Sequence, residues 1–136
     1  MPGKTVLIVD DDPDQHTICE AYLRHAGYSV LHAYDGEEGV EVARRARPDV
    51  ILMDRRMPRL DGLEALRRLT EREETRGIPV VALSADVLEW NESRALQEGF
   101  AAHIAKPTDL RRILSLVQRL IGGPEAAATL AGGVLL

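Results

Sequence analysis

The chain has 136 residues, which is enough for one domain with a buried core. Apolar residues make up 45% of it and charged residues 29%, as is typical of globular proteins, and a net charge of −5 argues against a nucleic-acid-binding surface. No apolar stretch is long enough to cross a bilayer, and the aspartates at 10–12 interrupt the first apolar run, so we expect neither a membrane span nor a signal peptide. The single cysteine, Cys19, excludes an internal disulfide, favours a cytoplasmic setting and is expected to be a small buried helix residue.

Short apolar runs alternate along the chain with longer segments of helical periodicity. This alternation predicts a parallel α/β sheet, and because the runs are apolar throughout, we expect helices on both faces of the sheet. The expected strands are residues 5–9, 29–33, 50–53, 80–83 and 101–105. The expected helices are residues 13–25, 37–46, a third that starts near 61 or 62, 87–98, and a fifth that ends near 121.

Capping residues support several of these boundaries. Asp12 as N-cap and Pro13 in the first turn favour the start of the first helix, and Gly27 favours its end. Thr108 is the expected N-cap of the last helix. The side chains expected to face the core from the helix at 87–98 are those of Val87, Leu88, Ala95 and Leu96.

Four of the expected strands end at polar side chains. Asp10 and Asp11 follow the first strand, Asp54 the third, Ser84 the fourth and Lys106 the fifth. The carboxyl ends of parallel strands open onto the edge of the sheet at which such folds bind ligands. The sequence therefore predicts one site with three carboxylates, one hydroxyl and one amine.

The chemistry of such a site follows from its charges. Clustered carboxylates repel one another, and a divalent cation relieves the repulsion; oxygen ligands favour Mg²⁺ or Mn²⁺ over zinc. The Lys106 amine and the Ser84 hydroxyl suit a phosphoryl group, since one counters its charge and the other donates a hydrogen bond. A carboxylate that faces a metal-bound phosphoryl donor can act as a nucleophile and form an acyl phosphate.

The sequence resembles the receiver domains of two-component response regulators over about residues 4–121. The resemblance rests on the order and spacing of several motifs rather than on any one of them. The motifs are Leu7-Ile8-Val9-Asp10-Asp11-Asp12, Ile51-Leu52-Met53-Asp54-Arg55-Arg56-Met57-Pro58 with Asp61-Gly62, Leu83-Ser84-Ala85, and Ile104-Ala105-Lys106-Pro107.

The resemblance implies a flavodoxin-like, doubly wound (βα)5 fold with strand order 2-1-3-4-5. It implies a phospho-acceptor switch rather than an enzyme: Asp54 takes a phosphoryl group from a histidine kinase or phosphotransfer protein. The face formed by the helix at 87–98, the strand ending at Ala105 and the last helix would then bind a downstream target protein. No direct contact with nucleic acid or membrane is expected.

The resemblance also assigns roles around the metal and the phosphoryl group. Asp10, Asp11 and Asp54 would hold Mg²⁺ together with the main-chain carbonyl of Arg56. Ser84 would be the switch hydroxyl and Lys106 would contact the phosphoryl group. The Lys106-Pro107 peptide is expected to be cis, as in the family.

Four residues carry more specific hypotheses. His103 stands where the family usually has an aromatic switch residue; the alternative is a partly exposed strand residue. Arg56 and Asp86 are hypothesised to pair across the mouth of the site and slow hydrolysis, and the alternative is two solvated side chains. Trp90 lies off the core stripe of its helix, where it either anchors a partner or packs on its own helix. Dimerisation through that face is left open.

Other functional classes fit less well. A phosphatase of the haloacid dehalogenase type needs a second acid two residues after its nucleophile and a threonine soon after, and neither Asp10 nor Asp54 is followed by that pattern. A flavodoxin-like carrier needs a Ser/Thr/Gly-rich phosphate loop after the first strand, which is absent. The expected organisation is a stand-alone receiver at 1–121 with a short flexible tail at 122–136; the alternative is a receiver from a longer regulator, with Gly122-Gly123-Pro124 starting a linker.

Overall fold

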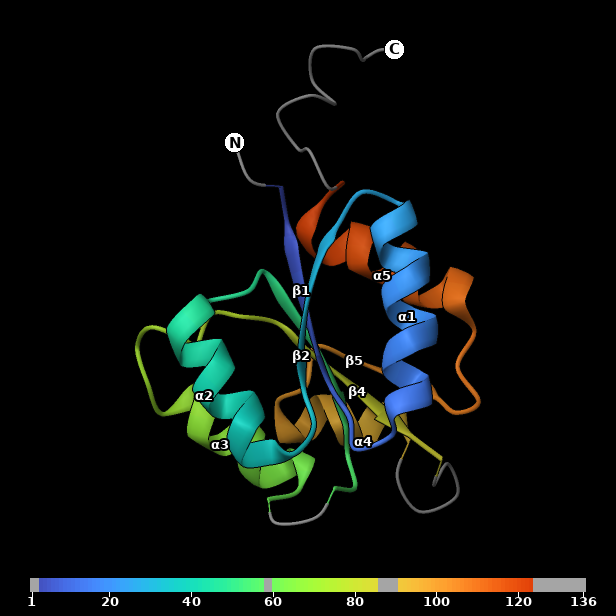
Figure 1. The fold of residues 1–136 in the computed structure, drawn as a ribbon. Coiled ribbons are helices and arrows are strands. Elements are labelled where there is room, and N and C mark those ends of the chain that lie inside the picture. Colours follow the sequence, from blue (N-terminus) through green and yellow to red (C-terminus); the bar gives the residue numbers. More distant parts are fainter. Residues whose placement is uncertain (1–2, 58–59, 86–90, 124–136) are drawn as a thin grey trace.

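The computed structural model describes residues 3–57, 60–85 and 91–123. Five parallel strands form one sheet in the order β2-β1-β3-β4-β5, and the chain alternates strand and helix throughout (Figure 1). The strands are β1 Thr5–Val9, β2 Ser29–Ala33, β3 Val50–Asp54, β4 Val80–Ser84 and β5 Ala102–Ala105. The helices are α1 Pro13–His25, α2 Gly36–Ala46, α3 Gly62–Thr70, α4 Glu92–Glu98 and α5 Leu110–Ile121. The expected doubly wound fold and strand order are confirmed.

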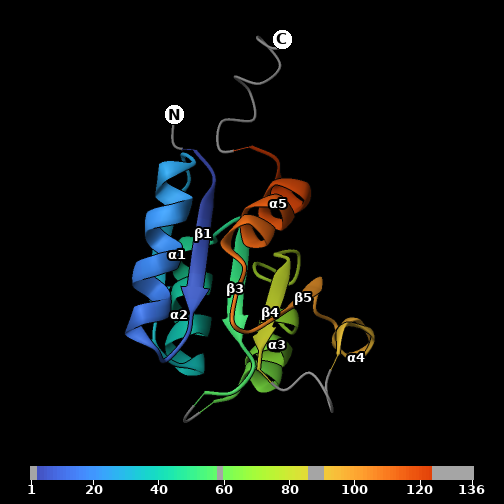
Figure 2. The same ribbon diagram turned by 90° about the vertical axis from the view of Figure 1, so that its right-hand side faces the viewer.

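The helices cover both faces of the sheet. In Figures 1 and 2, α1 and α5 lie on one face and α2 and α3 on the other, while α4 lies beside β5. Side chains of β1 alternate between the two layers: Leu7 and Val9 belong to one buried cluster and Val6 and Ile8 to the other. All four of these side chains are fully buried, which is why the strand reads as a continuous apolar run.

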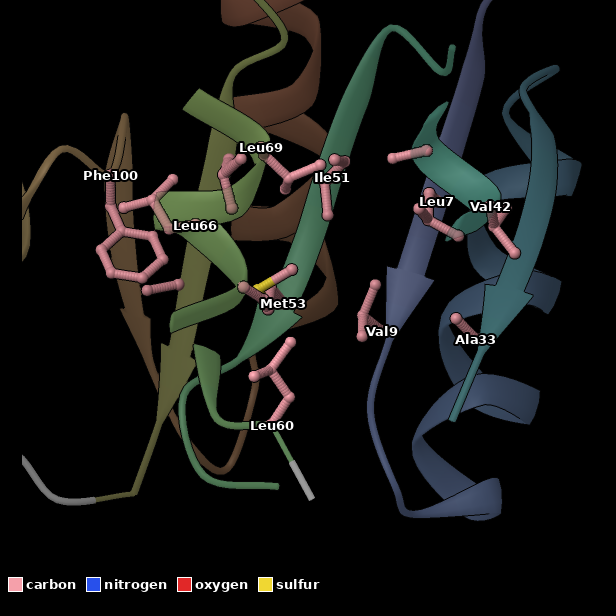
Figure 3. Packing of buried hydrophobic residues seen from close by; sticks show 14 of the residues in the cluster. Leu7, Val9, Ala33, Val42, Ile51, Met53, Leu60, Leu66, Leu69 and Phe100 are labelled. Carbon is pink, nitrogen blue, oxygen red and sulfur yellow. The ribbon is translucent and has the colours of Figure 1, made fainter. Parts of the chain in front are cut away.

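The cluster beneath α2 and α3 anchors the loop that follows β3. Figure 3 shows Leu66 and Leu69 of α3 lying across from Ile51 and Met53 of β3, with Leu60 at the carboxyl end of the strand. α3 thus packs its apolar stripe on the sheet, and its N-terminus lies close to Asp54. The N-cap is Asp61, whose carboxylate accepts a hydrogen bond from the Glu64 main-chain N–H.

Two predicted helix starts are wrong. α4 begins at Glu92, because Asn91 has an extended backbone and its side chain accepts a hydrogen bond from the Arg94 N–H, which makes it the N-cap. α5 begins at Leu110, and its N-cap is Asp109 rather than Thr108. The Thr108 hydroxyl instead accepts a hydrogen bond from the Gln15 side chain on α1, at 3.3 Å.

Predictions about individual side chains had mixed outcomes. Ala95 is buried as expected, but Leu96 is 51% exposed, so its assignment to the core is wrong. α4 starts at Glu92 and is only seven residues long, and of Ala95 and Leu96 it buries only Ala95. Val87 and Leu88 lie outside the described residues. None of the helices in the described ranges is long and apolar enough to cross a membrane.

Cys19 is buried in α1, as expected, with 1% of its surface exposed. Burial raises the pKa of its thiol to about 11, and the negative charge of Asp10 adds to this effect. The thiolate is the nucleophile in thiol chemistry, so a buried thiol with a raised pKa is inert.

We therefore expect Cys19 to resist alkylation in the folded protein. At about pH 8 a thiol with a pKa of about 11 has a thiolate fraction on the order of one in a thousand, and burial also shields the sulfur from the reagent. The measurement is the rate of labelling by a small aromatic disulfide, with the protein in urea as the control that should react at once. Rapid, complete labelling of the folded protein would contradict the burial of this side chain.

Candidate functional site

The carboxyl edge of the sheet brings the predicted polar side chains together. Asp10 follows β1, Asp54 ends β3 and Ser84 ends β4, while Lys106 follows β5. The register pairs Asp54 with Leu83 and Ser84 with Ala105, which aligns the ends of three neighbouring strands. The Lys106 ammonium lies 3.1 Å from Asp10 Oδ2 and 3.3 Å from Asp54 Oδ2.

Three carboxylates form the acidic part of the site. Asp10, Asp11 and Asp54 each offer an oxygen, and the three oxygens lie within 4.8 Å of one another. Asp10 is fully buried and Asp54 is 8% exposed, whereas Asp11 faces solvent. A cluster of hard oxygen ligands that is open on one side suits Mg²⁺, which keeps several of its waters when it binds carboxylates.

The electrostatics of the site show an excess of negative charge. Burial raises the pKa of Asp54, and the charge of Asp10 raises it further, while Lys106 opposes both effects. Burial by itself would lower the pKa of Lys106, but the two neighbouring carboxylates outweigh it and raise that pKa. One ammonium therefore faces two buried carboxylates, and a divalent cation would restore the balance.

The loop after β3 is held by main-chain hydrogen bonds. Asp54 Oδ1 accepts from the Arg56 N–H at 3.2 Å, and the Arg55 N–H donates to the Leu83 carbonyl at 2.9 Å. The Gly62 N–H donates to the Arg55 carbonyl at 2.9 Å. A Cβ at Gly62 would lie 2.8 Å from the Asp54 carbonyl oxygen and 2.9 Å from the Arg55 Cα, so this close approach requires glycine.

An open pocket of about 360 Å³ lies beside these groups, lined by Asp54, Arg56, Ser84, Ala85 and Lys106. Ser84 is 2% exposed, and its carbonyl accepts a hydrogen bond from the Lys106 main-chain N–H at 2.9 Å. The Lys106-Pro107 peptide is cis, as expected. The pocket thus places a carboxylate, a hydroxyl-bearing residue and an ammonium around a space that can hold a phosphoryl group.

His103 is buried on β5 with 6% of its surface exposed, so the alternative of a partly exposed strand residue is wrong. Burial lowers the pKa of its ring; the carboxylate of Glu92 at the start of α4 opposes this shift, and the guanidinium of Arg112 on α5 adds to it. Asp86 and Trp90 lie outside the described residues, and their hypotheses, including the pairing of Asp86 with Arg56, stay predictions.

The sequence analysis missed a pair of histidines beside this site, of which His16 is buried and His32 is half-buried. His16 on α1 and His32 on β2 lie with their Nδ1 atoms 2.7 Å apart, and His16 Nε2 lies 2.8 Å from the carbonyl oxygen of Asp10. The available signal was that two of the four histidines, His32 and His103, fall in predicted strands of an otherwise apolar sheet, and only His103 was singled out.

Known proteins are similar to this chain in sequence. The protein PilH of Pseudomonas aeruginosa is 36% identical over 118 residues, covering 87% of this chain and 98% of its own length. The polar-differentiation response regulator DivK of Brucella ovis is 34% identical, covering 88% of this chain and 97% of its own length.

Solved structures agree. The receiver domain of a sensor histidine kinase from Pseudomonas aeruginosa, with a magnesium ion coordinated in its active-site cleft, has a TM-score of 0.81 and 40% identity, and covers 89% of this chain and 99% of its own. The receiver domain of the Saccharomyces cerevisiae response regulator Ssk1, solved with the histidine phosphotransfer protein Ypd1, has a TM-score of 0.80 and 26% identity, and covers 88% of this chain and 90% of its own.

The fold and the acidic edge define a phospho-accepting signalling domain that uses a divalent cation. The chain belongs to the response regulator receiver domain family, which matches residues 6–118. It is therefore a phospho-acceptor of two-component signalling rather than an enzyme with a separate substrate, and its cation is Mg²⁺.

We expect Gly62→Ala to destabilise the protein by about 1–3 kcal/mol, because the added methyl group overlaps the main chain of Asp54 and Arg55. The matched control is Gly77→Ala, where nothing lies within 4 Å of the added atom. The control should be neutral or stabilising by up to about 1 kcal/mol. Urea unfolding measures both, and equal stability of the two variants would contradict the close packing at Gly62.

We expect acid to destabilise the protein partly through His103. Its folded-state pKa lies below its ordinary value of 6.5, so the unfolded chain takes up a proton first as the pH falls, and stability is lost. The free energy of unfolding should therefore drop less between about pH 7.5 and about pH 5.5 in His103→Phe than in the parent. The same drop in both proteins would show that the buried ring does not contribute.

Proposed function

We propose that Asp54 accepts the phosphoryl group from the phosphohistidine of a histidine kinase or phosphotransfer protein. The observation that carries the proposal is the contact of the Lys106 ammonium with both Asp54 and Asp10 at the mouth of the acidic cluster. The cation ligands in this proposal are the carboxylates of Asp10, Asp11 and Asp54 and the main-chain carbonyl of Arg56. The similarity to Ssk1, which was solved with a phosphotransfer protein, supports a donor of this kind.

The transfer is a displacement at phosphorus. The Asp54 carboxylate attacks, a new O–P bond forms, and the P–N bond to the donor histidine breaks, with the imidazole leaving. Bound Mg²⁺ would neutralise charge on the transferred phosphoryl oxygens. The Lys106 ammonium, which contacts Asp54 Oδ2, would supply a second positive charge beside the transferred phosphoryl group. Phosphoryl transfer needs positioning and charge neutralisation above all, which these residues provide.

The phosphorylated site signals through its neighbours. The Ser84 hydroxyl would donate a hydrogen bond to the phosphoryl oxygens. A movement of Ser84 would shift the end of β5, because the Lys106 main-chain N–H donates a hydrogen bond to the Ser84 carbonyl. His103 lies buried on the same strand, and charges from both α4 and α5 act on its ring. A change at Ser84 would therefore shift the face formed by α4, β5 and α5, the surface proposed for a downstream protein or a second copy, with Trp90 as a candidate anchor.

Several finer expectations belong to the same proposal. We place the protein in the cytoplasm, with the receiver domain at residues 1–121 and a short C-terminal segment at 122–136. The pair of Arg56 and Asp86 is proposed to shield the acyl phosphate from water, and Arg56 lines the pocket as this requires.

The deciding experiment is phosphorylation by acetyl phosphate in the presence of Mg²⁺, read by intact mass. The parent should gain one phosphoryl group and Asp54→Asn should gain none, because its amide is not a nucleophile. Removing Mg²⁺ with a chelator should abolish the gain in the parent.

A matched control separates loss of the acceptor from loss of the fold. Asp49 lies at the opposite edge of the sheet, where its carboxylate accepts a hydrogen bond from the Thr5 main-chain N–H. The Asp49→Asn variant should therefore be phosphorylated like the parent. A phosphoryl group that appears on Asp54→Asn with the parent's kinetics would overturn the assignment of Asp54.

A further inference from the structure

A line of hydrogen-bonded side chains runs from the surface of α1 to the main chain of Asp10. His16 is 3% exposed, and its Nε2 lies 2.8 Å from the Asp10 carbonyl oxygen. Its other ring nitrogen, Nδ1, lies 2.7 Å from Nδ1 of His32 on the neighbouring strand β2. His32 Nε2 in turn lies 2.9 Å from Glu20 Oε1, one turn further along α1.

The chemistry of the end groups fixes the direction of these bonds. A carbonyl oxygen only accepts, so His16 Nε2 donates to Asp10. An ionised carboxylate also only accepts, and the hydrogen bond from Arg24 lowers the pKa of Glu20 and keeps it ionised. His32 Nε2 therefore donates to Glu20.

The contact between the two rings needs one more hydrogen. One hydrogen between the two Nδ1 atoms completes the line of hydrogen bonds from Asp10 to Glu20. Tyr34 stacks on the His16 ring, with centroids 4.2 Å apart at 29°, and holds the ring from a third side.

The Asp10 peptide is therefore tied at each polar group. Its N–H donates to the Ala33 carbonyl on β2 at 3.1 Å, and its carbonyl accepts from His16. One carboxylate oxygen accepts from the Asp12 N–H at 2.9 Å and the other from Lys106. Without His16, the carbonyl would lose the partner that orients it in a fully buried setting, and the residue could rotate away from the metal site.

We propose that His16 is a positioning residue for the Mg²⁺ site, which holds Asp10 through its main-chain carbonyl, and that His32 and Glu20 fix the orientation of the His16 ring. The proposal rests on the proposed function only in taking Asp10 as a cation ligand. Partners that orient a metal ligand typically change metal affinity by 10- to 100-fold when removed, and a main-chain contact to one of several ligands belongs at the low end of that range.

The test compares Mg²⁺ dissociation constants, measured calorimetrically on the unphosphorylated full chain well below the melting temperature of every variant. His16→Met removes both ring nitrogens and keeps apolar bulk; it should weaken Mg²⁺ binding roughly ten-fold. His16→Gln retains an N–H donor near the position of Nε2 and should recover most of the parent's affinity. Glu20→Gln changes a carboxylate at the surface and should weaken binding about two-fold, which is one-third of the logarithmic effect of His16→Met.

Controls separate positioning from general loss of stability. Val117→Ala removes buried volume from α5 without touching a site residue and should lower the melting temperature while leaving the Mg²⁺ affinity at the parent's value. The proposal is overturned if His16→Met binds Mg²⁺ like the parent, or if His16→Gln is as weak as His16→Met, since the ring would then act through packing alone.

Two further outcomes are also decisive. If His16→Met does not fold, Glu20→Gln decides, because Glu20 is only partly buried and this conservative change should leave the fold intact. Parent-like Mg²⁺ affinity in Glu20→Gln overturns the role of His32 and Glu20 in orienting the His16 ring. If the parent itself binds no Mg²⁺, the cation site of the proposed function is wrong, and the positioning role of His16 is wrong with it. If the parent binds Mg²⁺ and the variants bind it with the parent's affinity, only the positioning role is wrong.

Discussion

The structure depends on a charge imbalance that is held in place by burial. Asp10 and Asp54 are withdrawn from water at the carboxyl edge of the sheet, and one ammonium, that of Lys106, lies between them. Burial and mutual repulsion raise the pKa of Asp54 even with Lys106 in contact. The site therefore keeps an excess of negative charge without a cation, and this excess favours the binding of Mg²⁺. The same imbalance makes the site sensitive to phosphorylation, because a phosphoryl group on Asp54 changes the negative charge that the Lys106 ammonium neutralises.

Such an arrangement persists only if the backbone around it is rigid, and the structure supplies that rigidity from several directions. The strand register aligns the strand ends at which Asp54, Ser84 and Lys106 lie. The cluster around Ile51, Met53 and Leu66 fixes α3 beside the loop that follows Asp54. Gly36 is even more closely packed than Gly62: a Cβ there would lie 2.0 Å from the Leu60 carbonyl oxygen, so the first residue of α2 lies directly against the loop after β3. On the other side of the sheet, the His16–His32 pair holds the peptide of Asp10. The site is thus enclosed by backbone contacts that leave its charged groups little room to relax apart.

The order of the elements and most of the site were predictable from the sequence because they depend on local patterns. Apolar runs mark buried strands whatever surrounds them, and a polar residue at the end of such a run falls at the carboxyl edge of a parallel sheet; Asp54 and Ser84 follow this rule. The predictions that failed depend on competition between neighbouring residues. Asp109 rather than the adjacent Thr108 is the N-cap of α5, and Asn91, inside the expected helix at 87–98, is the N-cap of α4. Leu96 is exposed because α4 is short and buries only one side of its expected stripe.

The sequence by itself determined the fold class, the five strands and the residues that meet at the acidic edge, since periodicity and chain order carry that information. Only the tertiary structure decided how charge is balanced there and what supports it. The contact of Lys106 with Asp10 joins residues 96 positions apart, and His16 meets His32 across two elements. Such contacts are set by the packing of α1 against the sheet and by the position of β5 within it, and no pattern within a single element records them. The burial of Asp10 and Asp54, which makes a cation site of these two carboxylates and the neighbouring exposed Asp11, is likewise a property of the folded chain alone.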